Sequence, residues 1–313
     1  MSLYPKNLNE YVASLGIPRG PLSKAYLVDP VNGNNNNPGT SWQAPLLTLT
    51  AAEDKCVANR HDTVLFLAGA TADGPVLEIG WDKSYTHLVG IGCEIPGVGQ
   101  RCRVVTPAAN AHQTITFSGN GCIVKNMQFN NEHASGTAIG ICTVSGFRNY
   151  FENVFFMVPT SQTAASFSLK ATGTENYFKR CTIGQHTLVR GAASYGLWIE
   201  KGDGDCQRNR FIDCEILSWS NVTTHVPIKI DADIDVECFT VFFENLLISN
   251  IVTGGGLLAH AVVDGATNIY HQLIFKGITT VIGCTGFADV TTYVWSNAPQ
   301  PVNTFWTPVN PSH

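Results

Sequence analysis

Charged side chains are scarce in this sequence. Only 14% of its 313 residues are Asp, Glu, Lys or Arg, whereas an ordinary soluble domain carries about 25%. A coiled coil or helical bundle is excluded, because such proteins are rich in Ala, Glu, Lys, Leu and Arg. The net charge of −5 argues against nucleic acid as a main partner, because phosphate binding needs a basic face.

Two other missing features narrow the class of protein further. No apolar run approaches the length of about 18 residues that a membrane span needs, and the N-terminus lacks the apolar core of a secretion signal. Disorder is excluded because 44% of the residues are apolar and the net charge is low. We therefore expect a strand-rich protein that uses neither a membrane nor nucleic acid as a partner.

The ten cysteines have neither disulfide nor zinc spacing, since no C-x-x-C pair occurs. Without a secretion signal we expect reduced thiols that pack as small apolar residues. The nine histidines are scattered, with no H-E-x-x-H motif and no i, i+4 pair. We expect them at the surface or satisfied in the core rather than as metal ligands.

Gly (29), Pro (15) and Asn (24) replace the missing charge, and a repeat accompanies them. A short apolar segment recurs at intervals of 27 to 33 residues, beginning at Val124, Phe151, Phe178, Phe211, Phe243 and Phe275. A second apolar column follows three residues later, at Met127, Val154, Cys181, Cys214, Leu246 and Ile278. A third lies two residues further on, at Phe129, Phe156, Ile183, Ile216, Ile248 and Thr280, where Thr280 is the exception. A step of two is strand alternation, so the step of three predicts a corner between two short strands.

Two further registers accompany this repeat. Asn precedes the Phe column by two residues at Asn149, Asn176 and Asn209. Another apolar position recurs before each corner, at Leu169, Ile199, Ile230 and Val263. Each period thus holds two or three short strands and no segment of helix length. Short strands, corners and stacked like side chains at a period near 30 predict a solenoid, because a propeller blade needs about 40 residues.

The residues that begin the repeat carry a more specific signal. Residues 26–33 read as a strand with an Asn-Gly turn, an Asn-rich loop follows, and Asp62-Thr63-Val64 begins the first coil. Between them, an apolar stripe at helical spacing comprises Leu46, Leu49, Ala52, Cys56 and Val57, with Glu53, Asp54, Lys55 and Arg60 outside. Over residues 25–285 the sequence resembles the right-handed parallel β-helix, the pectate-lyase-like superfamily, and most of all the β-helix proteins of tailed-phage virions. The resemblance implies that the helix covers the open end of the solenoid.

We predict an all-β, single-stranded right-handed parallel β-helix in four parts. Residues 1–24 form an N-terminal arm of a short helix and a Pro/Gly linker, and 25–62 form the first strand, the Asn-rich loop and the capping helix. Residues 63–290 form the coils, and 291–313 an extended tail rich in Pro and aromatics. The arm either docks on its own solenoid or on a neighbour, and the tail either contacts a subunit or folds back over the last coil. The predicted partner contacts are Leu8, Tyr11, Val12, Leu15, Trp295, Phe305 and Trp306.

Alignment of the second register places Lys170, Glu200, Asp231 and Asp264 in one outward column. Rungs lie about 4.8 Å apart, near the carboxylate separation of a retaining glycosidase. Lys201 and Lys229 lie beside this column, so a lyase with a basic proton acceptor is a second possibility. Outward positions must be polar in any case, and we favour that structural interpretation. The candidate catalytic residues are Glu200, Asp231, Asp264 and Lys229.

Other candidate sites are weaker. Asp203, Asp205 and Asp233 could supply oxygens for calcium, and we expect no other cofactor. Exposed aromatics that could hold a glycan are Tyr195, Trp198 and Trp219.

The resemblance implies a non-enzymatic structural virion protein of a tailed bacteriophage, a capsid decoration (cement) or spike-like component. Such a protein would be a homotrimer, assembled in the host cytoplasm with other capsid or tail proteins. Two alternatives stay open: a polysaccharide lyase or glycoside hydrolase of the tailspike type, and a non-catalytic module that binds a host glycan.

Overall fold

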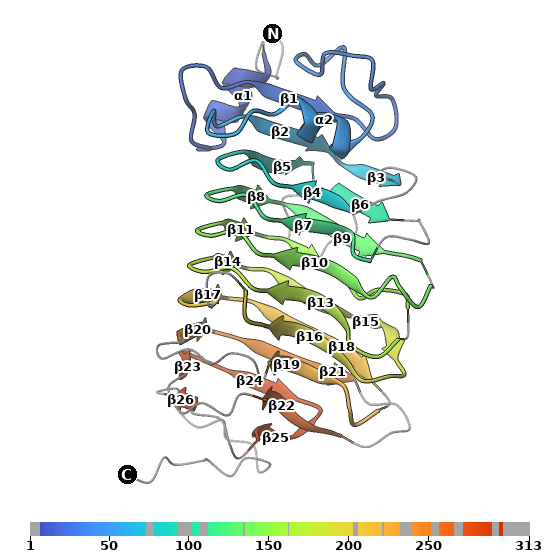
Figure 1. The fold of residues 1–313 in the computed structure, drawn as a ribbon, viewed down its shortest axis with the longest axis vertical. Helices are drawn as coiled ribbons and strands as arrows, with labels where there is room; N and C mark the ends of the chain where they lie inside the picture. Colours follow the sequence, from blue (N-terminus) through green and yellow to red (C-terminus); the bar gives the residue numbers. More distant parts are fainter. Residues whose placement is uncertain are drawn as a thin grey trace.

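The computed structural model describes residues 7–72, 78–92, 102–106, 112–133, 135–161, 163–202, 206–220, 222–231, 240–251, 257–265, 272–289 and 294–296. The chain winds into stacked coils whose strands form three parallel sheets, with β1 at one end of the stack and β26 near the other (Figure 1). Two short helices, α1 (Leu8–Ser14) and α2 (Leu49–Lys55), lie at the N-terminal end. Neither described helix has the length or hydrophobicity to cross a membrane.

Every strand pairs in parallel with the equivalent strand of the coils before and after it. The first sheet contains β1 (Ala25–Val28), β2 (Thr63–Leu67), β5 (His87–Ile91), β8 (Ile123–Lys125), β11 (Tyr150–Glu152), β14 (Tyr177–Lys179), β17 (Asn209–Ile212), β20 (Thr240–Glu244), β23 (Gln272–Lys276) and β26 (Val294–Ser296). The second contains β3 (Gly69–Ala72), β6 (Cys102–Thr106), β9 (Met127–Asn131), β12 (Phe155–Phe156), β15 (Thr182–Arg190), β18 (Glu215–Ser220), β21 (Leu247–Ile251) and β24 (Thr280–Ile282). The third contains β4 (Ile79–Trp81), β7 (Ile115–Phe117), β10 (Gly140–Val144), β13 (Ser166–Ala171), β16 (Ser194–Ile199), β19 (Val226–Ile230), β22 (Leu258–Asp264) and β25 (Cys284–Ala288). The predicted parallel solenoid is confirmed.

In the six successive coils that begin at β8, the chain turns from the first sheet to the second at a residue with a left-handed backbone. Its φ lies between 52° and 73° at Asn126, Asn153, Arg180, Asp213, Asn245 and Gly277. The left-handed region is unfavourable for most residues and least so for Gly, Asn and Asp, which hold all but one of these places. At Gly277 a Cβ would stand 2.3 Å from Asn245 Oδ1, so this corner needs glycine. The predicted corner is therefore confirmed.

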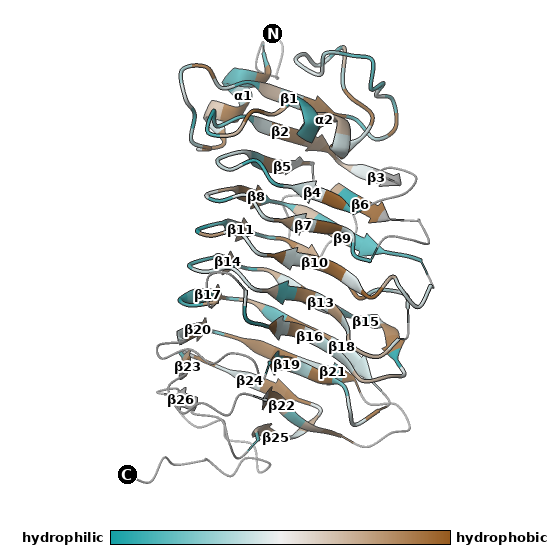
Figure 2. Ribbon diagram, viewed as in Figure 1, coloured by the Kyte–Doolittle hydropathy of each residue, from teal (hydrophilic) through white to brown (hydrophobic). Residues whose placement is uncertain are grey.

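The Phe column forms a continuous stack inside the solenoid. Strand register aligns Val124 and then Phe151, Phe178, Phe211, Phe243 and Phe275. All are buried, neighbouring ring centroids lie 4.6 to 5.2 Å apart, and neighbouring ring planes differ by 16° or less. Figure 2 shows both hydrophobic and hydrophilic stretches on the strands of the coils. Like side chains stack well along such a column, and the apolar repeat was its signature.

A ladder of buried asparagines runs beside the Phe stack. Asn149 N donates to Asn176 Oδ1 at 2.9 Å, and Asn176 N donates to Asn209 Oδ1 at 2.8 Å. In the preceding coil, Cys122 N donates to Asn149 Oδ1 at 2.7 Å. The amides that donate stand just before β8, β11 and β14. Because a buried amide needs a hydrogen-bond partner, the asparagine side chains supply one. The Asn register is thus structural.

The cysteines behave as predicted within the described residues. Eight are free, seven of them fully buried and Cys284 half-buried. Burial raises the pKa of the Cys206 and Cys142 thiols above the ordinary range, which keeps them neutral and apolar in character.

The N-terminal end is closed by the chain itself. In α2, Leu49 and Ala52 are buried against the main core, as the stripe predicts. In α1, Leu8 and Val12 are buried in a second cluster over Leu27 of β1. The arm therefore docks on its own solenoid, the first of the two predicted alternatives.

Four details differ from the sequence prediction. Ile278, which the sequence places in the second apolar column, is 69% exposed. Val281, not Thr280, pairs with Ile248 in the third column, because the last corner carries one more residue. Glu53 is buried rather than outside, because Lys83 Nζ from the next coil contacts its Oε2 at 3.1 Å. Val57 is 47% exposed, because the chain leaves α2 at Cys56 and the helical spacing ends there.

We expect Phe178→Ala to lower the free energy of unfolding by about 3–5 kcal/mol, because it leaves a cavity between two stacked rings. Urea denaturation would measure this. Tyr177→Ala is the control: Tyr177 is half-buried and stacks on Tyr150 on the outer side of the same strand. Tyr177→Ala should lower the free energy of unfolding by about 1 kcal/mol or less. Equal losses for the two variants would contradict the importance of the inner stack.

Candidate functional site

The register of the third sheet decides which predicted residues are neighbours. Lys170 of β13 pairs with Trp198 of β16, and Trp198 pairs with Lys229 of β19. Lys229 pairs in turn with Val263 of β22. All four side chains are half-buried, so these residues form one outward column. Lys170 thus aligns with Trp198 rather than with the acidic residues.

Glu200 and Asp231 occupy equivalent places in neighbouring coils, as the repeat predicts. Each follows its strand directly, and each amide donates to a carbonyl one coil earlier, at 3.1 and 2.9 Å. The amide of Gly265 does the same at 3.0 Å, so glycine holds this place in the following coil. Asp264 pairs with Ile230 and lies one residue earlier. The predicted column of four is therefore wrong at both ends.

The error in the column has a simple cause. Leu169 pairs with Leu197, two residues before Ile199, with which the sequence had aligned it. Residues two apart on a strand face the same side, so alternation cannot detect a slip of two. At the other end Val262 and Val263 are both apolar, and only the structure shows which of them continues the inward column.

Trp198 is the centre of a compact group on the outer face of the third sheet. Lys170 Nζ lies 4.0 Å from the Trp198 ring centroid, and Tyr195 and Phe167 pack edgewise against the ring, with centroids 5.1 and 5.7 Å away. We call this group the Trp198 cluster: Phe167, Lys170, Tyr195, Trp198, Glu200 and Asp231.

Both carboxylates of the cluster have protein partners. Lys170 Nζ forms an ion pair with Glu200 Oε2 at 2.5 Å, and Trp198 Nε1 donates to Asp231 Oδ2 at 3.1 Å. Burial, and then the charge of Asp231, raise the pKa of Tyr195. The cluster presents an aromatic surface with one cation and two carboxylates, joined across three coils.

Several predicted site residues lie outside this description. Asp203, Asp205 and Asp233 fall outside the described residues, as does the side chain of Asp264. Within the described ranges, His, Cys, Asp and Glu do not gather in threes that could hold a metal ion.

The predicted partner contacts divide in the same way. Leu8 and Val12 are covered by the chain's own first sheet and offer no surface to a partner. Tyr11 packs edgewise on Trp42 at 5.6 Å, and Leu15 joins the same cluster half-buried. The apolar face of a short helix packs onto an available apolar surface. Here that surface is the first sheet at its end strand, β1. Phe305, Trp306 and the Trp295 side chain lie outside the described residues.

A second polar group lies behind the Trp198 cluster. Arg190, at the end of β15, is 1% exposed. Its Nη1 donates to Pro159 O at 2.6 Å, its Nη2 to Ser166 Oγ, and its Nε to Ser194 Oγ at 3.4 Å. His225 is 4% exposed, and its Nδ1 lies 2.9 Å from Ser194 Oγ. Arg190 and His225 line one small cavity.

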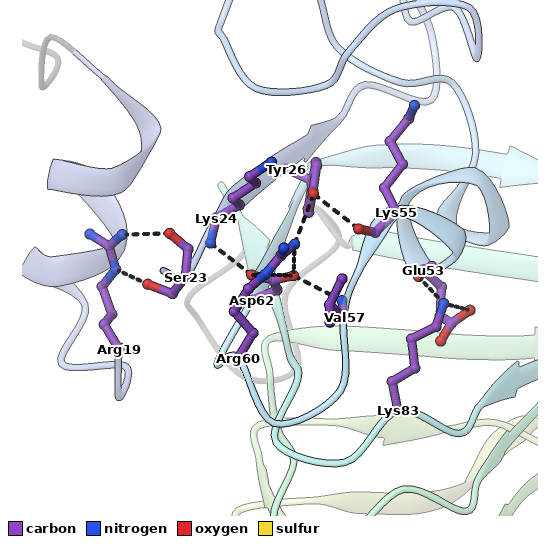
Figure 3. A network of polar contacts seen from close by, with 10 residues as sticks. All are labelled: Arg19, Ser23, Lys24, Tyr26, Glu53, Lys55, Val57, Arg60, Asp62 and Lys83. Carbon is purple, nitrogen blue, oxygen red and sulfur yellow. Dashed lines mark hydrogen bonds and ion pairs between the residues drawn. The ribbon is translucent and has the colours of Figure 1, made fainter. Parts of the chain in front are cut away.

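A third polar network joins the linker, β1 and α2 at the capped end (Figure 3). Its centre is Asp62, which is fully buried. The carboxylate of Asp62 accepts from Lys24 N at 2.7 Å and Val57 N at 2.9 Å and forms an ion pair with Arg60 at 2.5 Å. Two backbone amides and one arginine thus satisfy the Asp62 carboxylate. We interpret this network as structural, because it holds the chain where the first coil begins.

His61 and His87 stack beside this network. Ile123 N donates to His87 Nδ1 at 3.2 Å, and His61 Nδ1 lies 3.1 Å from His87 Nε2. Burial first, and then the neighbouring His61, lower the pKa of His87 to about 4, although Asp62 opposes the shift. His87 is therefore neutral at pH 7, a core histidine as expected.

Comparisons with known proteins agree on the architecture. Neither a family model nor a curated protein matches the sequence. Pectate lyase Pel9A aligns with a TM-score of 0.57 and 15% identity, over 92% of this chain and 80% of its own. Pectin methylesterase PemA from Erwinia chrysanthemi aligns with a TM-score of 0.52 and 12% identity, over 88% and 82%. The pectin methylesterase from Aspergillus niger has a TM-score of 0.51 and 12% identity, over 90% and 86%.

The chain has the right-handed parallel β-helix fold of these pectate lyase and pectin methylesterase structures. At these identities the likeness concerns this β-helix fold alone, because one fold carries many activities.

Sequence reasoning found part of these groups. It named Trp198, Tyr195 and Lys170 but did not join them, because their contacts depend on the register. It missed Phe167 and Arg190 altogether. Nothing in the sequence near Arg190 distinguishes a buried arginine from one at the end of an outward strand.

Acid should destabilise this β-helix through His87. Its pKa in the folded chain is about 4, below the ordinary value of 6.5, so the unfolded chain binds the proton first. The stability that His87 contributes is complete above about pH 6.5 and falls by about 3 kcal/mol as the pH drops to 4. Urea denaturation from pH 7 to 4 would measure the decline.

His87→Asn is the matched variant, because an Asn oxygen can still accept from Ile123 N but cannot become charged. The carboxylates and His225 titrate in both proteins, so the difference between the two pH profiles isolates His87. The decline between pH 6.5 and 4 should be shallower in the variant. Identical profiles would show that His87 is not the group responsible.

Proposed function

We propose that this β-helix binds an extended polysaccharide along the outer face of the third sheet, without cleaving it. The observation that carries the proposal is the Trp198 cluster. An aromatic ring offers apolar surface with a polar edge, and ligand sites combine such surface with a few placed polar groups. Here Lys170, Glu200 and Asp231 surround the half-buried Trp198 ring on consecutive coils.

The shape of the face also suits a linear polymer. The Lys170–Trp198–Lys229 column repeats polar or aromatic side chains from coil to coil, about 4.8 Å apart. A chain molecule laid along the solenoid would meet a similar surface at each step. The structurally similar proteins are pectin methylesterases and a pectate lyase by name, which is consistent with a polysaccharide ligand but rests on fold alone.

The contacts of the two carboxylates favour binding over cleavage. Glu200 is neutralised by Lys170, and Asp231 accepts from the indole of Trp198. A catalytic carboxylate must reach the reacting bond of the substrate, whereas both of these carboxylates are held by side chains of the cluster itself. We therefore place these carboxylates in the binding surface.

Trp198→Ala should remove binding to the polysaccharide that slows the migration of the wild-type protein most. The probes are polygalacturonate, pectin, a neutral glucan and a bacterial exopolysaccharide, each cast into a native affinity gel. Tyr177→Ala is the control, an outer-face aromatic on the first sheet. Wild-type retention that is unchanged in Trp198→Ala would contradict the proposed face, and retention by none of the four would contradict the proposed function.

The same preparations test the enzymatic alternative. Release of reducing ends or unsaturated products by the wild type, and its loss in Glu200→Gln or Asp231→Asn, would show that the protein is a depolymerase. The binding face would then be right, but the claim that it does not cleave would be wrong.

A separate observation favours an assembly role as a second candidate. Ile251, Leu257 and Ile282 are exposed near Gly283 in the last coils. Leu258 N donates to Gly283 O at 3.1 Å, and Ile282 pairs with β21, whose last residue is Ile251. Exposed apolar groups close together mark interaction surfaces. A homotrimer formed there would suit a structural virion protein, either capsid decoration or a spike-like component.

This second candidate predicts that the purified chain is an oligomer that Ile282→Asp dissociates, because a buried charge at an apolar contact is costly. Light scattering after size exclusion would measure the mass. Leu22→Asp is the control, an exposed apolar residue at the opposite end. A wild-type monomer, or an oligomer that Ile282→Asp leaves intact, would contradict assembly through this surface.

A further inference from the structure

The outer face of the third sheet extends well beyond the Trp198 cluster. Strand register continues the column of Lys170 and Trp198 through Thr143 and Thr116 to Gly80 of β4. Gly80 is exposed, and a Cβ there would meet no described atom within 4 Å. A polymer that lies on Trp198 would therefore continue over these coils. We call these positions the Lys170 column: Gly80, Thr116, Thr143, Lys170, Trp198, Lys229 and Val263.

A second outward column lies beside the first, at the residue that follows each strand. The amides of Ser118, Ser145 and Thr172 donate to carbonyls one coil earlier, as those of Glu200 and Asp231 do. Each of these residues stands two after a member of the Lys170 column, so the two columns share one face. We call the second one the Glu200 column: Asp82, Ser118, Ser145, Thr172, Glu200, Asp231 and Gly265.

Uncharged polar groups cover the first coils of this face. Thr116 and Thr143 are half-buried, and Ser118 is exposed. Gln113 joins the two threonines: its Nε2 donates to Thr116 Oγ1 at 2.6 Å, and its Oε1 accepts from Thr143 Oγ1 at 2.5 Å. Hydroxyl and amide groups both donate and accept hydrogen bonds, as the hydroxyls of a sugar do. This part of the face thus matches a sugar without a charge.

The charges of the face are acidic on balance. Lys170 and Lys229 are the cations of the two columns, and Lys170 already pairs with Glu200 at 2.5 Å. Carboxylates outnumber the lysines, because the Glu200 column also contains Asp82 and Asp231, and because Glu78 accepts from Thr116 Oγ1 beside the first coil. A carboxylate accepts strong hydrogen bonds from neutral donors, whereas it repels the carboxylates of an acidic polymer.

We propose that the polysaccharide bound by this face is uncharged, an inference that rests on the proposed function. The sugar rings pack on Trp198. The sugar hydroxyls exchange hydrogen bonds with the Thr and Ser side chains and donate to the carboxylates of the Glu200 column. The excess of carboxylates disfavours polymers that carry uronic acid, sulfate or phosphate groups.

Three pairs of polymers test the proposal, each pair with one backbone and two charge states. They are methyl-esterified and free polygalacturonate, a neutral glucan and its carboxymethyl form, and an acidic bacterial exopolysaccharide in its carboxyl-reduced and native forms. Each is cast into a native affinity gel at low salt. In a pair that slows the wild-type protein, the dissociation constant of the charged member should be about tenfold higher, because exposed like charges repel. Added salt should narrow this difference by screening the charges.

Asp231→Asn separates the charge of the face from its shape, because the amide oxygen still accepts from Trp198 Nε1. The difference within a pair should shrink by about threefold, the range of one exposed charge interaction. Asp213→Asn is the matched control. It removes the same charge from an exposed corner between the first and second sheets, and the difference within the pair should stay as in the wild type.

The outcomes separate this inference from the proposed function. Equal or tighter binding of the charged member, abolished by Trp198→Ala, would overturn the uncharged ligand and leave the proposed face intact. Equal effects of Asp231→Asn and Asp213→Asn would also overturn it, because the charges of this face would then not select the ligand. A protein that no member of the three pairs slows would contradict the proposed function, and this inference with it.

Discussion

Parallel, in-register stacking is the constraint on which the rest of this structure depends. Each coil must place its backbone amides opposite the carbonyls of the coil before it, so every equivalent position has an equivalent environment. An inward phenylalanine therefore meets another phenylalanine. The buried amide before a strand of the first sheet meets an asparagine side chain of the next coil. The Phe stack and the Asn149–Asn176–Asn209 ladder both follow from this constraint. The left-handed corner keeps the register while the chain changes direction.

The same regularity explains how far sequence could reach. Features that repeat were predictable: the Phe column, the corners, the Asn ladder and the capping helix. Features that depend on one register choice were not. A slip of two residues moved Lys170 into the wrong column, because strand alternation has a period of two and gives both alignments the same inward face. Contacts formed once, such as Arg190 with Ser166 or Glu53 with Lys83, leave no periodic trace in the sequence.

Stacking also decides what a charged residue can do on the outer face. Like charges in equivalent places would lie one coil apart and repel. Several of the described charges avoid this by alternating in sign, whereas Glu200 and Asp231, in equivalent places of neighbouring coils, are held by Lys170 and Trp198. Arg148 and Arg208 flank Glu175 from the coils on either side, at 2.6 and 2.8 Å. In another column Lys125 and Arg180 both contact Glu152.

The scarcity of charge is therefore a consequence of the coil geometry. A charge is stabilised by an opposite one in a neighbouring coil, so many of the charges come in short ladders with uncharged stretches between them. Glu175 and Glu152 show the electrostatic result. Burial opposes ionisation of Glu152, but Arg180 and Lys125 together outweigh it and hold its pKa below the ordinary value. Arg148 and Arg208 likewise lower the pKa of Glu175. The Lys170–Glu200 pair obeys the same rule, which is why adjacent acids alone do not indicate catalysis in this fold. Arg190 departs from the rule, since it has no described carboxylate partner in the adjacent coils; neutral groups meet it instead, namely the Pro159 carbonyl and the hydroxyls of Ser166 and Ser194.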